Sequence, residues 1–372
     1  MGAARHSRHN LVSLACLFIV GVTPGCTIPH PPPIPADLSE ARVAYGSNVL
    51  SKTRFARYPE LNFITDLHYG RFGNGAEGEL AVVGTSGAAF VGLQGPIHRT
   101  THFAVRAFDR VALVQSKDGE VPLFLHRGSW VAKLHLFDEN GGVRWDFGTF
   151  WVSGIDYAAA GDLYGNGKLE FVVGLNGAGG IYLLDENGRE IWKKSGANVW
   201  HVEIASAEPG AEGRVVNSDA GGALTIRDPE GNVLQTFRPV QYVTSFGLAR
   251  WANEPKARHL MVPDKDAIVF LDLNGQETAR LEAPGCTTMP HEILGVSICF
   301  SLRDCYQATL VNYKVWNRAV LYLDDLNGKL VYREVFVRQC ESLGTIPVAL
   351  HKNAGNLLAG CGDEVFEYTK RQ

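Results

Sequence analysis

The sequence predicts an all-β fold, a single β-propeller built from seven four-stranded blades. The first observation is an internal repeat, because short turns of the type "LDENGR" recur 43 to 53 residues apart. Their glycines are Gly141, Gly188, Gly231, Gly275 and Gly328. The second is that β-rich runs flank these turns. The third is that no segment keeps an apolar period of about 3.6 residues, so little helix is expected.

Each turn is predicted to join the outer two strands of a blade. The runs "GGIYLL" (179–184) and "REIWK" (189–193) flank one such turn. An Asp-x-Asn-Gly or Asp-x-Glu-Gly link suits a tight hairpin, because glycine accepts the positive φ that other residues resist. Two more strand-like runs, "GIDYAAAG" (154–161) and "LEFVVGL" (169–175), precede it. Four short antiparallel strands per repeat make a propeller blade.

Counting the repeats gives the number of blades. A sixth turn, "GLQGPI" (92–97), matches the pattern only in part. A seventh set of strands begins at "GTIPVALHKN" (344–353) and lacks a final outer strand. The stretch at 45–59 resembles the outer strand at 230–240, since both contain Asn-Val-Leu. We therefore expect residues 42–60 to close the last blade and residues 61–372 to form the blades, because closure removes exposed edges. A ring of six or eight blades is the alternative.

The N-terminus predicts export. Residues 1–26 form a basic leader followed by twelve apolar or small residues (11–22), too few to span a ~30 Å hydrocarbon layer. The segment ends in "TPGC", where Cys26 resembles the lipidated cysteine of bacterial lipoproteins. The resemblance implies a lipid anchor. It also implies the outer membrane, because Thr27 stands where an aspartate would signal retention in the inner membrane. An ordinary cleaved signal is the alternative. Proline-rich residues 27–41 predict an extended tether.

Charge argues against nucleic acid as a partner. The formal net charge is −4, and residues 1–26 contribute two arginines and no acid to it. The remaining chain has no lysine or arginine run longer than two. A nucleic-acid binder needs a basic patch or stripe, so this class is not expected.

One repeat carries a family resemblance. The stretch "GDLYGNGKLEFVVG" (161–174) resembles the FG-GAP/VCBS repeat, and "IYLLDENGREIWK" (181–193) resembles the quinoprotein-like (PQQ-type) propeller repeat. "FGNGAEGELAVVG" (72–84) is a second, partial match. The resemblance implies a propeller over nearly the whole mature chain. It implies little about activity, because this fold carries enzymes, adhesins and scaffolds.

The same stretch contains a weak calcium candidate. Asp162, Asn166 and Glu170 match oxygen ligands of calcium-binding copies of the repeat, but Tyr164 stands where another acid or amide belongs. Calcium takes about six to eight oxygen ligands, and three side chains supply too few. We therefore expect Asp162 to accept backbone N–H groups in a turn, and we favour no metal or other cofactor.

Five cysteines follow Cys26, all in the last two predicted blades. Cys299 and Cys305 flank a short turn between two strands, while Cys340 precedes a first strand and Cys361 ends the next. An exported protein can hold disulfides, so we favour the pairs Cys299–Cys305 and Cys340–Cys361, with Cys286 free. Buried unpaired cysteines are the alternative.

The loops that lead into the innermost strands should converge on one mouth of the central channel. They bring together aromatic, histidine and carboxylate side chains suited to a polar ligand or a protein hot spot. The candidates are Trp151, Asp156, Trp200, His201, Glu203, Tyr242, His291 and Glu292.

Two classes of function fit this mouth. The first is a non-enzymatic, monomeric envelope lipoprotein that binds a protein or a glycan. The second is an exported polysaccharide lyase or hydrolase that uses His201 with Glu203 or His291 with Glu292 as acid and base. Only Arg238 and Arg250 stand out as arginines near the mouth. A lyase would need more of them to hold a charged substrate, so binding is preferred.

Overall fold

The computed structural model describes residues 32–72, 78–93, 97–104, 110–114, 121–126, 133–148, 154–206, 210–238, 243, 245–250, 258–264, 266–286, 292–347 and 355–371. Residues Ile34–Gln372 form one compact unit. Its described elements are β-strands and three short 3-10 turns, Ala36–Leu38, Pro59–Leu61 and Lys314–Trp316. No helix in this part of the chain is long and apolar enough to cross a membrane.

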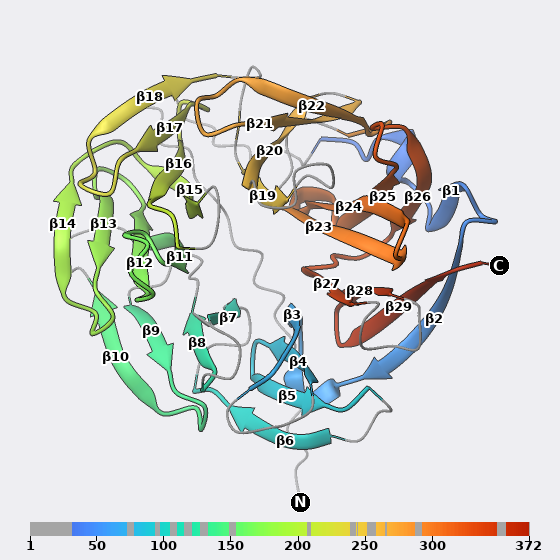
Figure 1. Ribbon diagram of the computed structural model, residues 1–372, viewed down its shortest axis with the longest axis horizontal. Coiled ribbons are helices and arrows are strands. Elements are labelled where there is room, and N and C mark those ends of the chain that lie inside the picture. The colour runs from blue at the N-terminus through green and yellow to red at the C-terminus, as the bar shows by residue number, and fades with distance from the viewer. Residues whose placement is uncertain are drawn as a thin grey trace, which may run out of the picture. The chain divides into compact units, whose positions relative to one another are not determined.

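Seven antiparallel sheets are arranged in a ring (Figure 1), which confirms the predicted seven-bladed propeller. Blade 1 contains β3 (Ile64–Gly70), β4 (Glu79–Gly84), β5 (Gly87–Val91) and β6 (Ile97–His102). Blade 2 contains β7 (Val111–Val114), β8 (Leu123–His126), β9 (Lys133–Phe137) and β10 (Val143–Gly148). Blade 3 contains β11 (Ile155–Gly161), β12 (Glu170–Leu175), β13 (Gly180–Leu184) and β14 (Glu190–Lys194).

The remaining blades follow the same order from the innermost strand outward. Blade 4 contains β15 (Val199–Ser206), β16 (Gly213–Asp219), β17 (Leu224–Arg227) and β18 (Val233–Phe237). Blade 5 contains β19 (Gly247–Arg250), β20 (Arg258–Asp264), β21 (Ala267–Leu271) and β22 (Glu277–Glu282). Blade 6 contains β23 (Glu292–Ser301), β24 (Asp304–Tyr313), β25 (Arg318–Asp324) and β26 (Leu330–Phe336). Blade 7 contains β27 (Ser342–Ile346), β28 (Asn356–Cys361), β29 (Glu364–Lys370) and β2 (Leu50–Arg57).

The N-terminal strands close the ring. β2 pairs with β29, with Leu50 opposite Lys370 and Arg57 opposite Glu364, so the last blade takes its outer strand from the N-terminal region as predicted. The preceding strand, β1 (Arg42–Tyr45), adds a fifth strand to blade 6 by pairing with β26. Figure 1 shows these blue strands beside the red C-terminal strands. The sequence assigned 42–60 to one closing strand, but this stretch holds two strands that join two blades.

The tether prediction needs one correction. Residues 36–38 belong to the segment expected to be extended, yet they form a 3-10 turn in which Leu38 is fully buried. Leu38 packs in the cluster that contains Phe270 and Tyr322, and Asp37 pairs with Arg333. The chain is therefore fixed to the propeller from this turn onward. The signal peptide, Cys26 and the start of the tether lie outside the described residues.

The repeated turns hold their hairpins through an aspartate. Asp185 Oδ1 accepts the backbone N–H groups of Asn187 and Arg189, each at 2.8 Å. The corresponding aspartates of blades 2, 5 and 6 accept the same pair of N–H groups. These side chains compensate backbone donors that the tight turn leaves outside the strand ladder. The Asp-x-x-Gly pattern therefore forms the turns for a physical reason.

The core lies between the blades. The second and third strands of blade 3 are buried along their whole length, while its outer strand, β14, is mostly exposed. Val172 and Leu183 of blade 3 pack with Val202 and Val215 of blade 4 in one apolar cluster. Each sheet therefore stabilises its neighbours, and the ring fixes where the innermost strands begin.

Both disulfides lie in the last two blades. Cys299 bonds to Cys305 across β23 and β24, and Cys340, just before β27, bonds to Cys361 at the end of β28. These are the pairs favoured from the strand positions. Cys286 is buried and outside both disulfides, and desolvation raises the pKa of its thiol to about 12. A thiol in such surroundings is unreactive.

Candidate functional site

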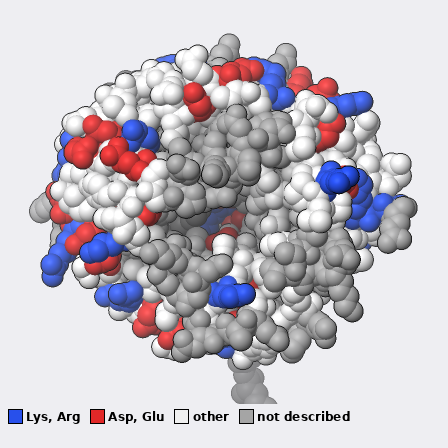
Figure 2. Space-filling model, viewed as in Figure 1, with Lys and Arg blue, Asp and Glu red and all other residues white. Residues whose placement is uncertain are grey.

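Charged side chains gather where the innermost strands begin. Asp156 lies in β11, His201 and Glu203 lie in β15, and Glu292 begins β23. The first strand of every blade faces the axis of the ring, so these starts share one mouth of the channel. Figure 2 shows the hollow at the centre of the ring, with charged atoms of both signs in its depth. This mouth is the candidate site.

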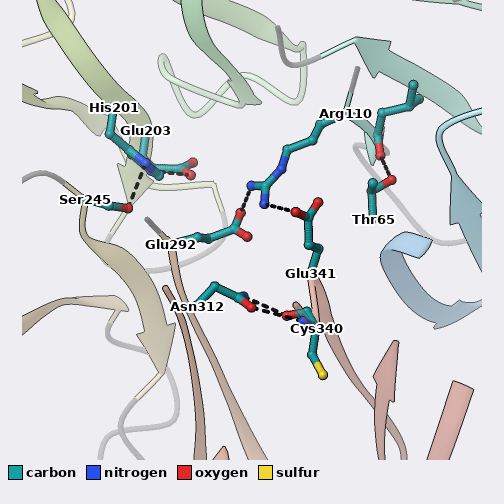
Figure 3. Close-up of polar contacts among 10 residues, drawn as sticks. Thr65, Arg110, His201, Glu203, Ser245, Glu292, Asn312, Cys340 and Glu341 are labelled. Atoms are coloured by element: carbon teal, nitrogen blue, oxygen red, sulfur yellow. Dashed lines mark hydrogen bonds and ion pairs between the residues drawn. The ribbon is translucent and has the colours of Figure 1, made fainter. Parts of the chain in front are cut away.

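Arg110, directly before β7, carries the central positive charge (Figure 3). Its Nη1 lies 2.5 Å from Oε1 of Glu292, and its Nη2 lies 3.0 Å from Oε1 of Glu341, just before β27. All three side chains are at most 12% exposed. Burial alone would lower the pKa of Arg110, but the two carboxylates outweigh it and raise the pKa. The charged triad joins blades 2, 6 and 7.

Neighbouring backbone contacts hold the triad in place. On the blade 2 side, Thr65 Oγ1 donates a 2.6 Å hydrogen bond to the carbonyl of Val111, the residue after Arg110. On the blade 7 side, Asn312 Nδ2 donates to the carbonyl of Cys340 at 2.6 Å, and its Oδ1 accepts the Cys340 N–H at 3.0 Å. Both contacts appear in Figure 3. The positions of Arg110 and Glu341 are therefore set by hydrogen bonds between blades.

His201 forms a second polar cluster across the channel wall (Figure 3). Its Nε2 lies 3.2 Å from Oε1 of Glu203, and its Nδ1 lies 3.2 Å from Oγ of Ser245. Tyr157 stacks on the imidazole at 4.0 Å between ring centroids, and Phe246 packs against it at 4.6 Å. A serine, histidine and carboxylate are the components of an acyl-transfer triad, but Ser245 is only 2% exposed. The cluster joins blades 3, 4 and 5, and its serine is buried.

Two further groups at the mouth have shifted pKa values. Desolvation raises the pKa of Asp156 to about 6, against a weaker opposing effect of hydrogen bonds from Asn176 Nδ2 at 3.2 and 3.4 Å. Lys314 is accessible to solvent, but the pKa of its ammonium group is lowered. Desolvation by neighbouring atoms is the main cause, repulsion by Arg110 adds to it, and attraction by Glu341 opposes it. The charge of this mouth therefore depends on pH near neutrality.

Five of the eight predicted mouth residues lie in an innermost strand, all but Glu203 in its first half. They are Asp156, Trp200, His201, Glu203 and Glu292. The structure brings His201 and Glu203 together and places Glu292 against Arg110. Trp151, Tyr242 and His291 lie outside the described residues, so their place at the mouth stays a prediction.

The sequence interpretation missed the residues that complete the site. Arg110 and Glu341 each directly precede an innermost strand, which is the same signal that selected Glu292, but neither was selected. Arg250 was expected near the mouth, and this was wrong, because it ends β19 at the opposite end of the strand. The position of a charge relative to the start of an innermost strand is thus the informative signal.

The weak calcium candidate lies in the turn between β11 and β12. Asp162 accepts the N–H groups of Asn166 and Gly167 at 2.9 and 2.8 Å, and Glu170 accepts the N–H of Leu163 at 2.8 Å. Asn166 Oδ1 accepts the N–H of Lys168. The carboxylates therefore receive backbone donors, as expected for a structural turn.

Neither a protein-family model nor a curated protein sequence matches this chain. Solved structures do match its fold. A crystal structure of BBS1N in complex with ARL6DN, soaked with mercury, aligns with a TM-score of 0.57 at 14% identity, covering 87% of this chain and 97% of that chain. A second crystal of the same complex, soaked with lead, gives a TM-score of 0.56 at 14% identity. At this identity the likeness establishes the propeller fold alone.

Proposed function

We propose that this chain is a non-enzymatic lipoprotein of the cell envelope whose propeller binds a protein partner at the channel mouth. The observation that carries the proposal is the internal pairing of the mouth. Arg110 is held by Glu292 and Glu341, and His201 is held by Glu203 and Ser245. These pairs hold the mouth in one arrangement, so a partner that binds there orders few side chains and binds at a low entropic cost.

Two other observations support the proposal. BBS1N, a propeller of similar fold, was crystallised in complex with ARL6DN, so a propeller of this kind can serve as a protein-binding scaffold. The basic leader, short apolar run and Cys26 favour export and lipidation. A glycan is the second class of ligand, since aromatic and carboxylate groups at a mouth suit sugars as well.

A polysaccharide-active enzyme is the alternative function. His201 and Glu203 lie within hydrogen-bond distance, as an acid and base pair requires. The imidazole side chain is only 5% exposed and lies against Tyr157 and Phe246, while the Glu203 side chain is 17% exposed. A base must reach the proton that it removes, so this pair fits a positioning role better than catalysis.

The test is proximity crosslinking in the native host followed by purification of the tagged chain. The mouth variant is Trp200→Ala, in the second residue of β15. The matched control is Val233→Ala, which removes a 55% exposed side chain from the outer strand β18. We expect a defined partner that the wild type and the control retain equally and the mouth variant loses at least tenfold.

The same preparations separate the two classes of function. Equal capture by both variants would contradict binding at this mouth. Release of reducing or unsaturated sugar ends from polysaccharides by the wild type, abolished in Glu203→Gln, would favour the enzyme instead. Circular dichroism checks that each variant is folded.

A further inference from the structure

A groove lies at the rim of the ring where blades 6 and 7 meet. β1 pairs with β26 only from Arg333 to Val335, so residues 336–338 extend beyond the fifth strand. The space beside them measures ≈ 500 Å³ and is lined by both N-terminal strands and by the end of β26. The side chains that matter are Arg42, Lys52, Glu334, Phe336 and Arg338. This groove is separate from the channel mouth.

The groove carries an excess of positive charge. Three of its lining side chains are cationic, namely Arg42, Lys52 and Arg338, and one is acidic, Glu334. Glu334 is buried and already engaged. Its Oε2 accepts the hydroxyls of Tyr332 and Tyr368 at 2.9 and 2.8 Å, and its Oε1 lies 2.6 Å from Lys52 Nζ. The acid therefore balances the charge of Lys52, and Arg42 and Arg338 are the other cations of the lining.

Aromatic rings position two of the cations. Lys52 Nζ lies 4.5 Å from the ring centroid of Phe336 and 4.2 Å from that of Phe366. The guanidinium of Arg338 lies 5.0 Å from the centroid of Phe366, while its Nη1 pairs with Glu364 at 2.8 Å. The cation–π contacts restrain both side chains, and Glu334 and Glu364 balance their charges. The cations are thus preorganised around the groove.

Arg42 is the cation that the fold does not use. It lies on an exposed strand, and no hydrogen bond or ion pair joins it to another described residue. Its strand is held by backbone pairing with Val335. The side chain is therefore available to a ligand, and its removal should leave the fold intact.

A second groove has the opposite charge balance. That groove, of ≈ 450 Å³, lies on blade 2 and is lined by Asp138, Glu139 and Arg144 among others. Its acids outnumber its single arginine, so an anion would be repelled there. Arg144 is exposed on the outer strand β10, as Arg42 is on β1, and provides a matched control.

We propose that the groove between blades 6 and 7 binds the phosphate group of a small ligand or of a lipid headgroup. Arginine forks and a lysine suit phosphate, because they offer several N–H donors to its oxygens and balance its charge. The bound phosphate would bridge Arg42 on β1 to Lys52 on β2 and Arg338 after β26. A ligand there ties together the two N-terminal strands that close the ring, so binding should also raise the melting temperature.

The test is isothermal titration of the full chain in detergent, at constant ionic strength. The probes are inorganic phosphate, glycerol 1-phosphate, dioctanoyl phosphatidylglycerol and the zwitterionic dioctanoyl phosphatidylcholine. We expect saturable binding of at least one of the first three, weakened at least fivefold by Arg42→Gln and less than twofold by Arg144→Gln. The melting temperature should rise with the ligand in the wild type and the control, but not in Arg42→Gln.

The probes also distinguish the sources of phosphate. Phosphatidylglycerol that binds at least tenfold more tightly than glycerol 1-phosphate identifies a lipid headgroup, and equal affinities identify a free phosphate or phosphate ester. The proposal is overturned if none of the three phosphate probes binds saturably. It is also overturned if Arg42→Gln and Arg144→Gln weaken binding equally, because that shows nonspecific charge attraction.

Discussion

At the scale of single residues, Asp324 breaks the pattern of the repeat. It directly precedes the turn aspartate of blade 6, a position that Phe137, Leu184 and Leu271 fill in blades 2, 3 and 5. Asp324 is fully buried, and neither carboxyl oxygen has a hydrogen-bond partner among the described residues. Desolvation, followed by the charges of Glu282 and Asp325, raises its pKa to about 8. A buried acid in this position costs stability.

We predict that Asp324→Asn stabilises the protein, and more so at alkaline pH. Because the pKa of the folded state lies above the unfolded value near 3.8, the folded state binds the proton more tightly. Stability therefore falls as pH rises from about 4 to 8, and the asparagine removes this loss. Urea unfolding should show a gain of about 1–3 kcal/mol at pH 8.5 and a smaller one at pH 5.

The neighbouring acid provides the control. Asp325 Oδ1 accepts the N–H groups of Asn327 and Lys329, so Asp325→Ala should lose stability at both pH values. A gain from Asp324→Asn that is the same at pH 5 and pH 8.5 would mean that Asp324 does not titrate in this range.

Single residues of the site were only partly predictable. The sequence placed His201, Glu203 and Glu292 near the mouth, because the loops that lead into the innermost strands converge there. It could not predict that Arg110 of blade 2 meets Glu292 and Glu341 of blades 6 and 7. That contact depends on the closure of the whole ring, which brings together residues separated by about half of the chain.

At the scale of elements, two of the repeated turns also contact the outer strand of the preceding blade. Trp145 of β10 donates its indole N–H to the carbonyl of Glu186 at 3.1 Å, and Trp192 of β14 donates to Pro229 at 2.7 Å. Both carbonyls belong to the turn of the following blade. Gly188 makes room for the first contact, since a Cβ there would lie 2.7 Å from Cδ2 of Trp145.

We predict that Gly188→Ala destabilises the protein by about 1–3 kcal/mol more than Gly210→Ala. Both glycines have a positive φ, +74° and +78°, so both substitutions incur the same backbone strain. A Cβ at Gly210 would meet nothing within 4 Å, whereas at Gly188 it would meet the indole. Chemical unfolding of the two variants measures the difference. Equal losses would show that the indole moves aside at little cost.

Most elements could be predicted because their signals are local. The Asp-x-Asn-Gly turns and flanking apolar runs placed the outer hairpins of blades 3 to 6 within a few residues. β1 could not be predicted, because it has four residues and all of them are exposed, so no apolar pattern marks it. Its position depends on pairing with a strand about 290 residues later in the chain.

At the scale of the whole molecule, Arg110 is predicted to stabilise the ring across its channel. Arg110→Met keeps an apolar stem but leaves Glu292 and Glu341 close together without a cation. Removing one partner of a buried ion pair costs about 3–5 kcal/mol, so thermal unfolding should occur at a clearly lower temperature. Replacing both glutamates by glutamine as well should recover much of this loss. No recovery would show that Arg110 acts through packing alone.

Ring closure by the N-terminal strands gives the last prediction. A chain that begins at Ile34 keeps β1 and β2, whereas one that begins at Pro59 lacks both. In the shorter chain, β29 has an unpaired edge and Glu334 loses Lys52. An exposed edge strand pairs with other chains, and a buried acid without its cation is destabilising, so we expect oligomers and a lower melting temperature. Light scattering and thermal melts measure both effects, with the chain from Ile34 as the control. If the chain that begins at Pro59 is monomeric and its melting temperature is unchanged, the ring closes without the N-terminal strands, with only three strands in blade 7.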